Sequence, residues 1–212
     1  MNSQELQNTL YQSPNRLGKL MANHLNLMFD IEATGVKPGC GILQIAVVPF
    51  TTAFTTMQEG YTNFDVVINR QSCIDAGLVE DPETLKWWQN QNANTVSKVF
   101  SGAVSIRDAM EQLYLYCKNL NAVIHPWSNA ASFDLQILRY TFDLLHIPVP
   151  WNFRDEMCFR TLKNLFPLTA CEKPVKYGPN HDAYFDAMHQ VSVANVIFNK
   201  LQESMPYAYS AI

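Results

Sequence analysis

Residues 28–35 read MFDIEATG and place two carboxylates, Asp30 and Glu32, inside a stretch with the composition of a buried strand. Side chains alternate between the faces of a strand, so both carboxylates project from the same face, about 7 Å apart along the chain. An unpaired buried carboxylate costs several kcal/mol, so it normally neutralises or finds a cation. Two of them on one face can share a divalent cation, although a lone Asp-x-Glu pair also occurs by chance.

The segments around this stretch predict a mixed α/β layered fold, with strands first and helices after them. Apolar, β-branched runs predict four strands, at 25–31, 42–50, 63–69 and 122–128, the first two paired as a hairpin. Apolar positions at helical spacing and capping signals predict four helices, at 81–91, 105–120, 133–146 and 182–201. The first helix has Asp81 as its N-cap and Pro82 at its first position, and Ser105 and Asp108 have capping-box spacing in the second.

Composition predicts one domain with one substantial core, because the chain has 212 residues of which 48% are hydrophobic. We expect this domain to span 24–205, between an N-terminal extension at 1–23 and a C-terminal tail at 206–212. The polar N-terminus and the lack of an 18-residue apolar run predict neither a signal peptide nor a membrane span, hence a cytoplasmic location. The five cysteines form no CxxC pair, which favours free thiols in a reducing compartment over a zinc site.

The net charge of −4 argues against a protein that grips nucleic acid through a long basic stripe. A nucleic-acid substrate would therefore be held over a short piece, with its phosphates neutralised by metal ions.

Two further segments carry carboxylates in an apolar context. In WSNAASFDLQIL (127–138), Asp134 stands at the start of a predicted helix, where the helix dipole favours an acidic side chain. In HDAYFDAMHQ (181–190), Asp186 lies inside a helix, five residues after His181. Taken singly, each of these residues can be explained by an ordinary structural role, such as helix capping or a place on the surface. Together, four carboxylates and one histidine predict an oxygen-rich site for two Mg²⁺ or Mn²⁺ ions, with a base that works near neutral pH.

The segments FDIEATG, SNAASFD and HDAYFDA resemble, in this order, the three exonuclease motifs of the DEDD superfamily. The histidine five residues before the last aspartate resembles the DEDDh branch. Three longer stretches, DPETLKWWQNQ, HPWSNAASFDLQIL and PVPWNFRDEMCFRTL, resemble phage DexA-like 3′–5′ exonucleases and related bacterial 3′–5′ exoribonucleases. The likeness runs from about Leu27 to Leu201. One departure is Cys158, because related sequences often carry an aspartate shortly before the Arg-Thr-Leu.

The resemblance implies a ribonuclease H-like fold, with a central mixed β-sheet flanked by helices. It implies a metal-dependent exonuclease that removes 5′-mononucleotides from the 3′ end of single-stranded DNA or RNA, in a bacterial or infected-host cytoplasm. It leaves a homodimer open. His181 would be the general base, and two Mg²⁺ or Mn²⁺ ions would be held by Asp30, Glu32, Asp134 and Asp186.

Seven residues are candidates for substrate contacts: Ala33, Thr34, Trp87, Asn129, Phe133, Arg154 and Arg160. Backbone groups near the first two would contact the last nucleotide, as the resemblance implies. Trp87 and its neighbour Trp88 point about 100° apart on a helix, so one can pack in the core while the other lines a substrate channel, or both can pack.

The remaining candidates each have two interpretations. Phe133 is either a core residue or a base-stacking one, and Asn129 either contacts a sugar or base or forms a turn. The two arginines, with Lys173 and Lys176, either form a basic segment over the site or belong to a solvated loop. Residues 172–180 would be the loop that leads to His181.

Two other functions stay open on sequence grounds. A catalytically silent nucleic-acid-binding or scaffold module would be expected to have lost a ligand, and none of the five site residues is missing. A small-molecule phosphodiesterase would share the ligands but would not release successive nucleotides from an oligomer.

Overall fold

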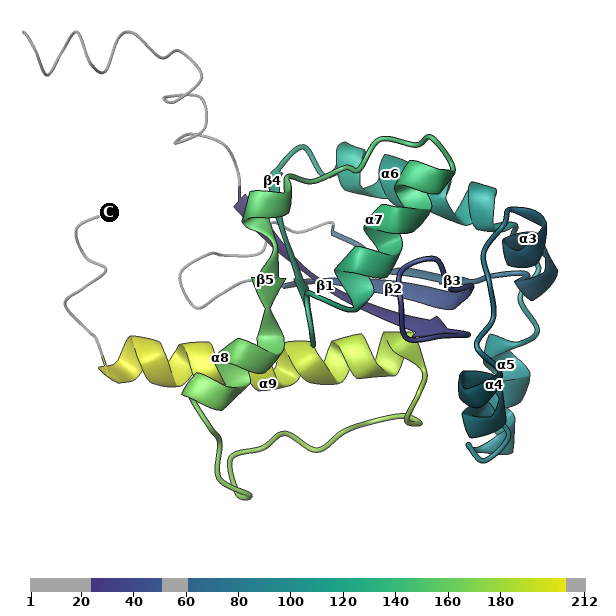
Figure 1. Cartoon of the computed structure of the whole chain (residues 1–212). Coiled ribbons are helices and arrows are strands. Elements are labelled where there is room, and N and C mark those ends of the chain that lie inside the picture. Colours follow the sequence, from purple (N-terminus) through teal and green to yellow (C-terminus); the bar gives the residue numbers. More distant parts are fainter. Residues whose placement is uncertain (1–23, 51–60, 205–212) are drawn as a thin grey trace, which may run out of the picture.

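The computed structural model describes residues 24–50 and 61–204, so the predicted extension at 1–23 and tail at 206–212 lie outside the described residues. The described part has helices on both faces of a five-stranded sheet (Figure 1). The strands are β1 (His24–Ala33), β2 (Ile42–Phe50), β3 (Phe64–Val67), β4 (Val123–Ser128) and β5 (Met157–Cys158). The helices are α3 (Arg70–Asp75), α4 (Pro82–Trp88), α5 (Ala93–Val99), α6 (Ile106–Asn119), α7 (Asp134–Leu144), the 3₁₀ turn η1 (Phe153–Asp155), α8 (Phe159–Leu165) and α9 (Ala183–Ser204).

The sheet has the strand order β3-β2-β1-β4-β5, which makes β1 its central strand. The predicted hairpin is confirmed, since β1 and β2 are antiparallel, and β2 also pairs with β3 in antiparallel fashion. β4 is parallel to β1, and β5 is parallel to β4. The sheet is therefore mixed, as the sequence predicts.

All four predicted strands and all four predicted helices are present, with ends that shift by a few residues. The predicted caps are confirmed as well. The side chain of Asp81 accepts a hydrogen bond from the N–H of Glu83, and Pro82 opens α4. The side chain of Ser105 accepts one from the N–H of Asp108. Sequence reasoning missed α3, α5, α8 and β5, because elements of two to seven residues carry too little periodicity to be recognised.

Composition predicts one substantial core, but β1 separates the two larger hydrophobic clusters of the described residues, because both faces of the sheet are covered. Leu27, Phe29 and Ile31 pack on one face with buried residues of α6 and α7. Met28 packs on the other face with the buried side of α9. Figure 1 shows α6 and α7 on one side of the sheet and α9 along the other. Because side chains alternate, the carboxylates that follow in β1 project toward α9, on one face as predicted.

The end of β1 is irregular. The pairing of β1 with β2 shifts between Glu32 and Ala33, which leaves Glu32 opposite Gln44 on the face toward α9. Such a bulge bends the strand and commonly lies beside an active site. Here it ends the regular ladder at the point where the polar residues gather.

All five cysteines are free thiols, as predicted. Within residues 24–50 and 61–204, no helix combines the length and the apolar character that crossing a membrane requires.

Candidate active site

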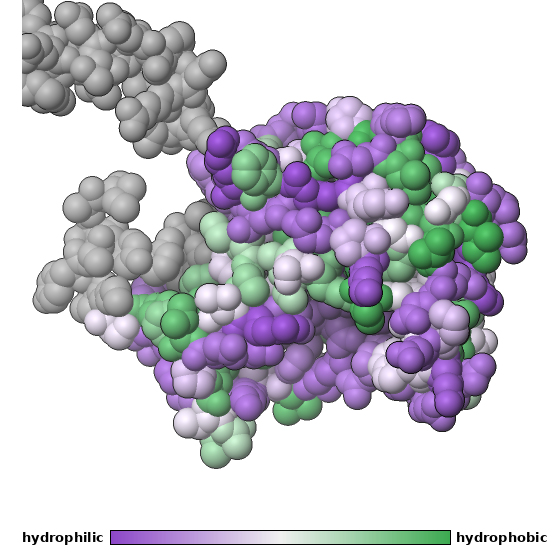
Figure 2. Space-filling view, in the orientation of Figure 1, coloured by the Kyte–Doolittle hydropathy of each residue, from purple (hydrophilic) through white to green (hydrophobic). Residues whose placement is uncertain are grey.

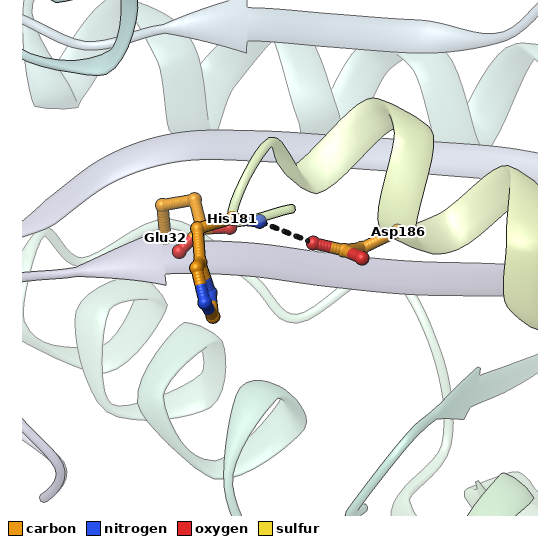
Figure 3. A group of neighbouring side chains, drawn as sticks. All are labelled: Glu32, His181 and Asp186. Carbon is orange, nitrogen blue, oxygen red and sulfur yellow. Dashed lines mark hydrogen bonds between the residues drawn. The ribbon is translucent and has the colours of Figure 1, made fainter. Parts of the chain in front are cut away.

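Three of the predicted site residues meet in one small group (Figure 3). Glu32 extends from the end of β1, His181 lies two residues before α9, and Asp186 is in the first turn of α9. One ligand atom from each of them lies within 4.8 Å of the others. The backbone N–H of His181 donates a hydrogen bond to Asp186 Oδ2 at 2.9 Å.

The other two predicted carboxylates adjoin this group. Asp30, on the same strand face as Glu32, accepts a hydrogen bond of 2.6 Å from Gln190 Nε2 of α9. Asp134 is the buried first residue of α7, and its Oδ1 accepts a hydrogen bond of 3.2 Å from the N–H of Ile31. The tertiary structure thus brings together four carboxylates from three distant segments.

Burial raises the pKa values of three of these carboxyls, and repulsion from the other carboxylates adds to the effect at Asp30 and Glu32. Burial is the largest cause at each, and it raises the pKa of Glu32 to about 8 and that of Asp134 to about 6. The pKa of Asp30 lies well above its ordinary value, because burial is reinforced by the charges of Asp134, Glu32 and Asp186. A shift of this kind means that the fold holds the carboxylates together at an electrostatic cost.

Positive charge and helix ends offset part of this cost. Lys176, which the sequence indicated only as part of a basic segment or a solvated loop, extends its ammonium group to Asp186 Oδ1 and, at 2.7 Å, to Asn180 Oδ1. Helices α7 and α9 both begin at the cluster, and the N-terminus of a helix carries a partial positive charge.

The cluster fits divalent cations. Its donors are carboxylate oxygens, which Mg²⁺ and Mn²⁺ prefer over nitrogen and sulfur. Their raised pKa values indicate that the described residues leave negative charge uncompensated at this position. An ion bound there would replace the missing countercharge.

His181 is held from several sides. Its backbone has a φ of 61°, in the left-handed region that few residues other than glycine adopt. Its ring makes edge contacts with the indoles of Trp87 and Trp88, with ring centroids 4.7 and 6.2 Å apart. Trp88 is itself tied to β1 by a 2.9 Å hydrogen bond from its indole N–H to the carbonyl of Ala33. The aromatic pair in α4 therefore packs against the histidine side chain.

Asp182, which sequence reasoning missed, fixes the start of α9. It is only 1% exposed, accepts a 2.6 Å hydrogen bond from Lys98 Nζ of α5, and accepts another of 3.2 Å from Gln44 Nε2 of β2. Gln44 in turn accepts from the N–H of Ala183 at 3.1 Å. This buried network locks the residue next to His181. An aspartate as the first residue of the helix predicted at 182–201 was the available signal for it, and its partners could not be read from the sequence.

Gln190 was missed as well, although its position offered a signal. It lies four residues after Asp186, which places both side chains on the same face of α9.

A mainly apolar cavity of about 420 Å³, whose rim includes Asp81 and Glu83, opens beside Glu32 between the end of β1 and α4. Three predicted contact residues line it, namely Ala33, Trp87 and Phe133. Trp87 is 42% exposed while Trp88 is 2% exposed, so one packs in the interior and the other faces the cavity, one of the two arrangements expected from sequence. Figure 2 shows the surface hollowed between the α4–α5 lobe and the rest of the domain.

The other four predicted contact residues do not line this cavity. Thr34 is buried, and its N–H and hydroxyl both donate to the carbonyl of Gly41. Asn129 begins the turn that follows β4, and its carbonyl accepts a long-range hydrogen bond from the N–H of Arg160. Arg154 stacks on the Phe153 ring in η1, with its guanidinium carbon 4.9 Å from the ring centroid.

The fold is that of the ribonuclease H-like exonucleases. Exonuclease I from Methylocaldum szegediense superposes with a TM-score of 0.58 at 12% identity, covering 87% of this chain and 42% of that one. Cell-death related nuclease 4 (CRN-4) superposes with a TM-score of 0.55 at 14% identity, covering 86% of this chain and 65% of that one. The nuclease domain of 3′hExo, a DEDDh family member bound to rAMP, superposes with a TM-score of 0.53 at 10% identity, covering 86% of this chain and 94% of that one. The chain thus spans less than two thirds of the first two proteins.

Residues 25–198 match the family profile of the 3′-5′ exoribonuclease Rv2179c-like domain, and the chain belongs to this family. The predicted kinship with bacterial 3′–5′ exoribonucleases is thereby confirmed at the level of the family, while a special closeness to the DexA-like enzymes stays a prediction. A search of curated protein sequences gives no match. Family and fold together support a nuclease.

The raised pKa of Glu32 predicts how the stability of the metal-free protein depends on pH. Between its ordinary pKa and about 8, the folded state keeps a proton that the unfolded state has lost, so the free energy of unfolding falls as the pH rises through this window. In EDTA, the melting temperature of Glu32→Gln minus that of wild type should therefore increase between pH 6 and pH 9. A gain of about 1 kcal/mol corresponds to about 2–4 °C in a domain of this size.

Glu83→Gln is the matched control, since it removes an exposed carboxylate from α4. Parallel melting curves for the Glu32 and Glu83 variants across the pH range would contradict the assignment of a raised pKa to Glu32.

Lys98→Met should destabilise the protein, because it leaves the buried Asp182 carboxylate without its cationic partner. Hydrogen bonds to charged groups contribute about 1.5–3 kcal/mol, and we expect a loss of that size in the free energy of unfolding from urea titration. The double variant Lys98→Met/Asp182→Asn should lose less free energy of unfolding than the sum of the losses in the two single variants. Lys118→Met on α6 is the control, and equal losses for the two lysine variants would refute the network.

Proposed function

We propose that this chain is a metal-dependent 3′–5′ exonuclease that hydrolyses single-stranded nucleic acid and releases 5′-mononucleotides. The observation that carries the proposal is the meeting of Glu32, His181 and Asp186 within 4.8 Å, beside two more carboxylates, in an exonuclease fold. A silent binding module has no reason to maintain such a set, because burying it destabilises the fold.

The four carboxylates, Asp30, Glu32, Asp134 and Asp186, would hold two divalent cations, Mg²⁺ or Mn²⁺. Such a pair, when bound, stabilises the attacking and leaving oxygens of an in-line phosphoryl displacement. Lys176 would have to leave Asp186 when the cations bind, since both compete for the same oxygen atom.

His181 is the general base in this proposal. A ring nitrogen near the Glu32 and Asp186 carboxylates is in position to accept a proton from the attacking water. The edge contacts with Trp87 and Trp88 limit rotation of the ring, and the network around Asp182 fixes its backbone. Both restraints favour one orientation of the base toward the carboxylates.

The apolar cavity beside Glu32 suits the 3′-terminal nucleoside. It is lined by the exposed Trp87 and by Phe133, and stacking of a base on an aromatic ring is worth about 1–3 kcal/mol. A nucleoside there would lie next to the carboxylates, with its 5′-phosphate toward them.

The proposal is tested with matched 5′-labelled single-stranded RNA and DNA oligomers, incubated with Mg²⁺, Mn²⁺ or EDTA. We expect a ladder that shortens by one nucleotide at a time and disappears with EDTA or with Asp30→Ala. The preferred sugar is read from the two ladders. Intact oligomers under every metal would refute the nuclease, and hydrolysis of only a small phosphodiester would favour the phosphodiesterase alternative.

His181→Ala should keep the fold and the metal affinity but lose about 10²- to 10⁴-fold in turnover, the usual contribution of a general base. His181→Asn separates the imidazole from the backbone, because asparagine tolerates a positive φ. His146→Asn is the control, since His146 also has a positive φ, of 56°, just beyond the far end of α7. Near-normal turnover in both His181 variants would remove this residue from the mechanism.

A further inference from the structure

A second cavity, of about 430 Å³, lies between α8, the chain that follows it and α9. Its polar lining consists of Lys163 and Asn164 from α8, Lys173 from the loop, and His189 from α9. Pro167, Leu168 and Val193 complete it. In Figure 2 the surface where α8 crosses α9 is strongly hydrophilic, unlike the apolar lining of the cavity beside Glu32.

The charge of this cavity is opposite to that of the chain. No carboxylate lines it, although the net charge of the protein is −4. Among residues 24–50 and 61–204, neither Lys163 nor Lys173 forms an ion pair. The nearest acidic residue along the chain, Glu172, is occupied elsewhere, by Lys200 Nζ at 2.5 Å and by the N–H of Thr169 at 2.8 Å. Lys163 Nζ lies 5.4 Å from the centroid of the Phe159 ring, which leaves its charge unneutralised, so both lysines can bind an anion.

The cavity adjoins the carboxylate cluster. His189 lies three residues after Asp186 on α9, slightly less than one turn and about 4.5 Å along the helix axis. Burial, followed by the nearby charge of Lys176, lowers the pKa of His189, and Lys163 acts in the same direction. Its Nδ1 is buried and has no hydrogen-bond partner among the described residues. A buried polar atom of this kind calls for a ligand or a water molecule.

The basic lining continues toward the sheet. Arg160 lies one turn before Lys163 on α8, and its backbone N–H is bonded to Asn129 at the end of β4, the strand next to β1. Figure 1 shows α4 and α8 on opposite sides of the start of α9. The carboxylates thus lie between an apolar cavity at α4 and a basic one at α8.

We propose that the cavity of Lys163, Asn164, Lys173 and His189 is a subsite for the backbone phosphates of the nucleic acid on the 5′ side of the scissile bond. This inference rests on the proposed function. Lysine ammonium groups, the Asn164 amide and a histidine ring are donors that bind phosphate oxygens without reading the base. The subsite would hence favour binding of an oligomer over a free nucleotide, without selecting for any particular base.

The test compares Lys163→Gln/Lys173→Gln with Arg107→Gln/Lys118→Gln, which removes the same charge from α6 on the other face of the sheet. Binding of a 5′-fluorescein hexanucleotide, as RNA and as DNA, is measured by anisotropy on the full chain, with Ca²⁺ in place of Mg²⁺ or Mn²⁺. We expect the cavity variant to bind about tenfold more weakly or worse. Its slope of log affinity against log salt should fall by about 1.4, or 0.7 for each single-strand phosphate contact.

The control variant should stay within about twofold of wild type, with the same slope. Equal affinities and slopes for the two double variants would overturn the subsite. Because this readout needs no turnover, it decides the question even if wild type hydrolyses nothing and the proposed function fails.

Two further measurements distinguish a phosphate subsite from a catalytic role of the lysines and from binding of free phosphate. Hydrolysis of bis-p-nitrophenyl phosphate with Mn²⁺ uses a diester too short to reach the cavity, so the cavity variant should keep the wild-type rate. An equal loss on this substrate and on the hexanucleotide would mean that the lysines act in the chemistry. Calorimetry with inorganic phosphate tests whether the cavity binds free phosphate instead of the phosphates of a nucleic-acid backbone. Phosphate binding that the variant loses, with unchanged hexanucleotide affinity, would assign the cavity to free phosphate and overturn the proposal.

Discussion

The structure depends on gathering four buried or half-buried carboxylates around the end of its central strand. Asp30 and Glu32 lie in β1, which has neighbours on both sides, so they cannot reach open water without breaking the sheet. The N-termini of α7 and α9 supply about +0.5 each, and Lys176 supplies one charge more. About +2 does not balance four carboxylates, so the described residues leave a deficit of positive charge. Burial is the largest cause of the raised pKa values of Asp30 and Glu32, and the charges of neighbouring carboxylates raise them further. The same deficit makes the site suitable for divalent cations.

The two hydrophobic cores offset the cost of this cluster. Strand β2 is buried along its full length, and α6, α7 and α9 cover the sheet on both faces. Asp182 is buried with partners on two sides, because Lys98 and Gln44 both donate hydrogen bonds to its carboxylate. Because this network is fully buried at one end, it holds the chain at His181 in a strained backbone conformation that a loop alone would relax. Stability and the geometry of the site therefore come from the same contacts.

In the proposed function, the two cavities beside the cluster would recognise different parts of the substrate. The cavity at α4 is apolar and aromatic, which suits a base, whereas the cavity at α8 is basic, which suits a phosphate. An acidic protein can bind an anionic polymer in this way, since a few local lysines suffice for a short stretch of backbone. The overall charge of a chain is thus a poor guide to its partner when the positive groups are gathered in one place.

The sequence by itself determined the fold class and the longer strands and helices, and it indicated five candidate site residues, because these depend on local patterns. Alternation in β1 predicted that its carboxylates share a face, and the caps at Asp81 and Ser105 predicted where two helices begin. Only the tertiary structure decided which residues meet across the chain. Lys176 on Asp186 and Lys98 on Asp182 join segments that are apart in sequence, and the short helices gain their stability from packing rather than from pattern. Such contacts depend on which distant segments lie side by side in the folded chain. Local patterns in a single sequence do not reveal this.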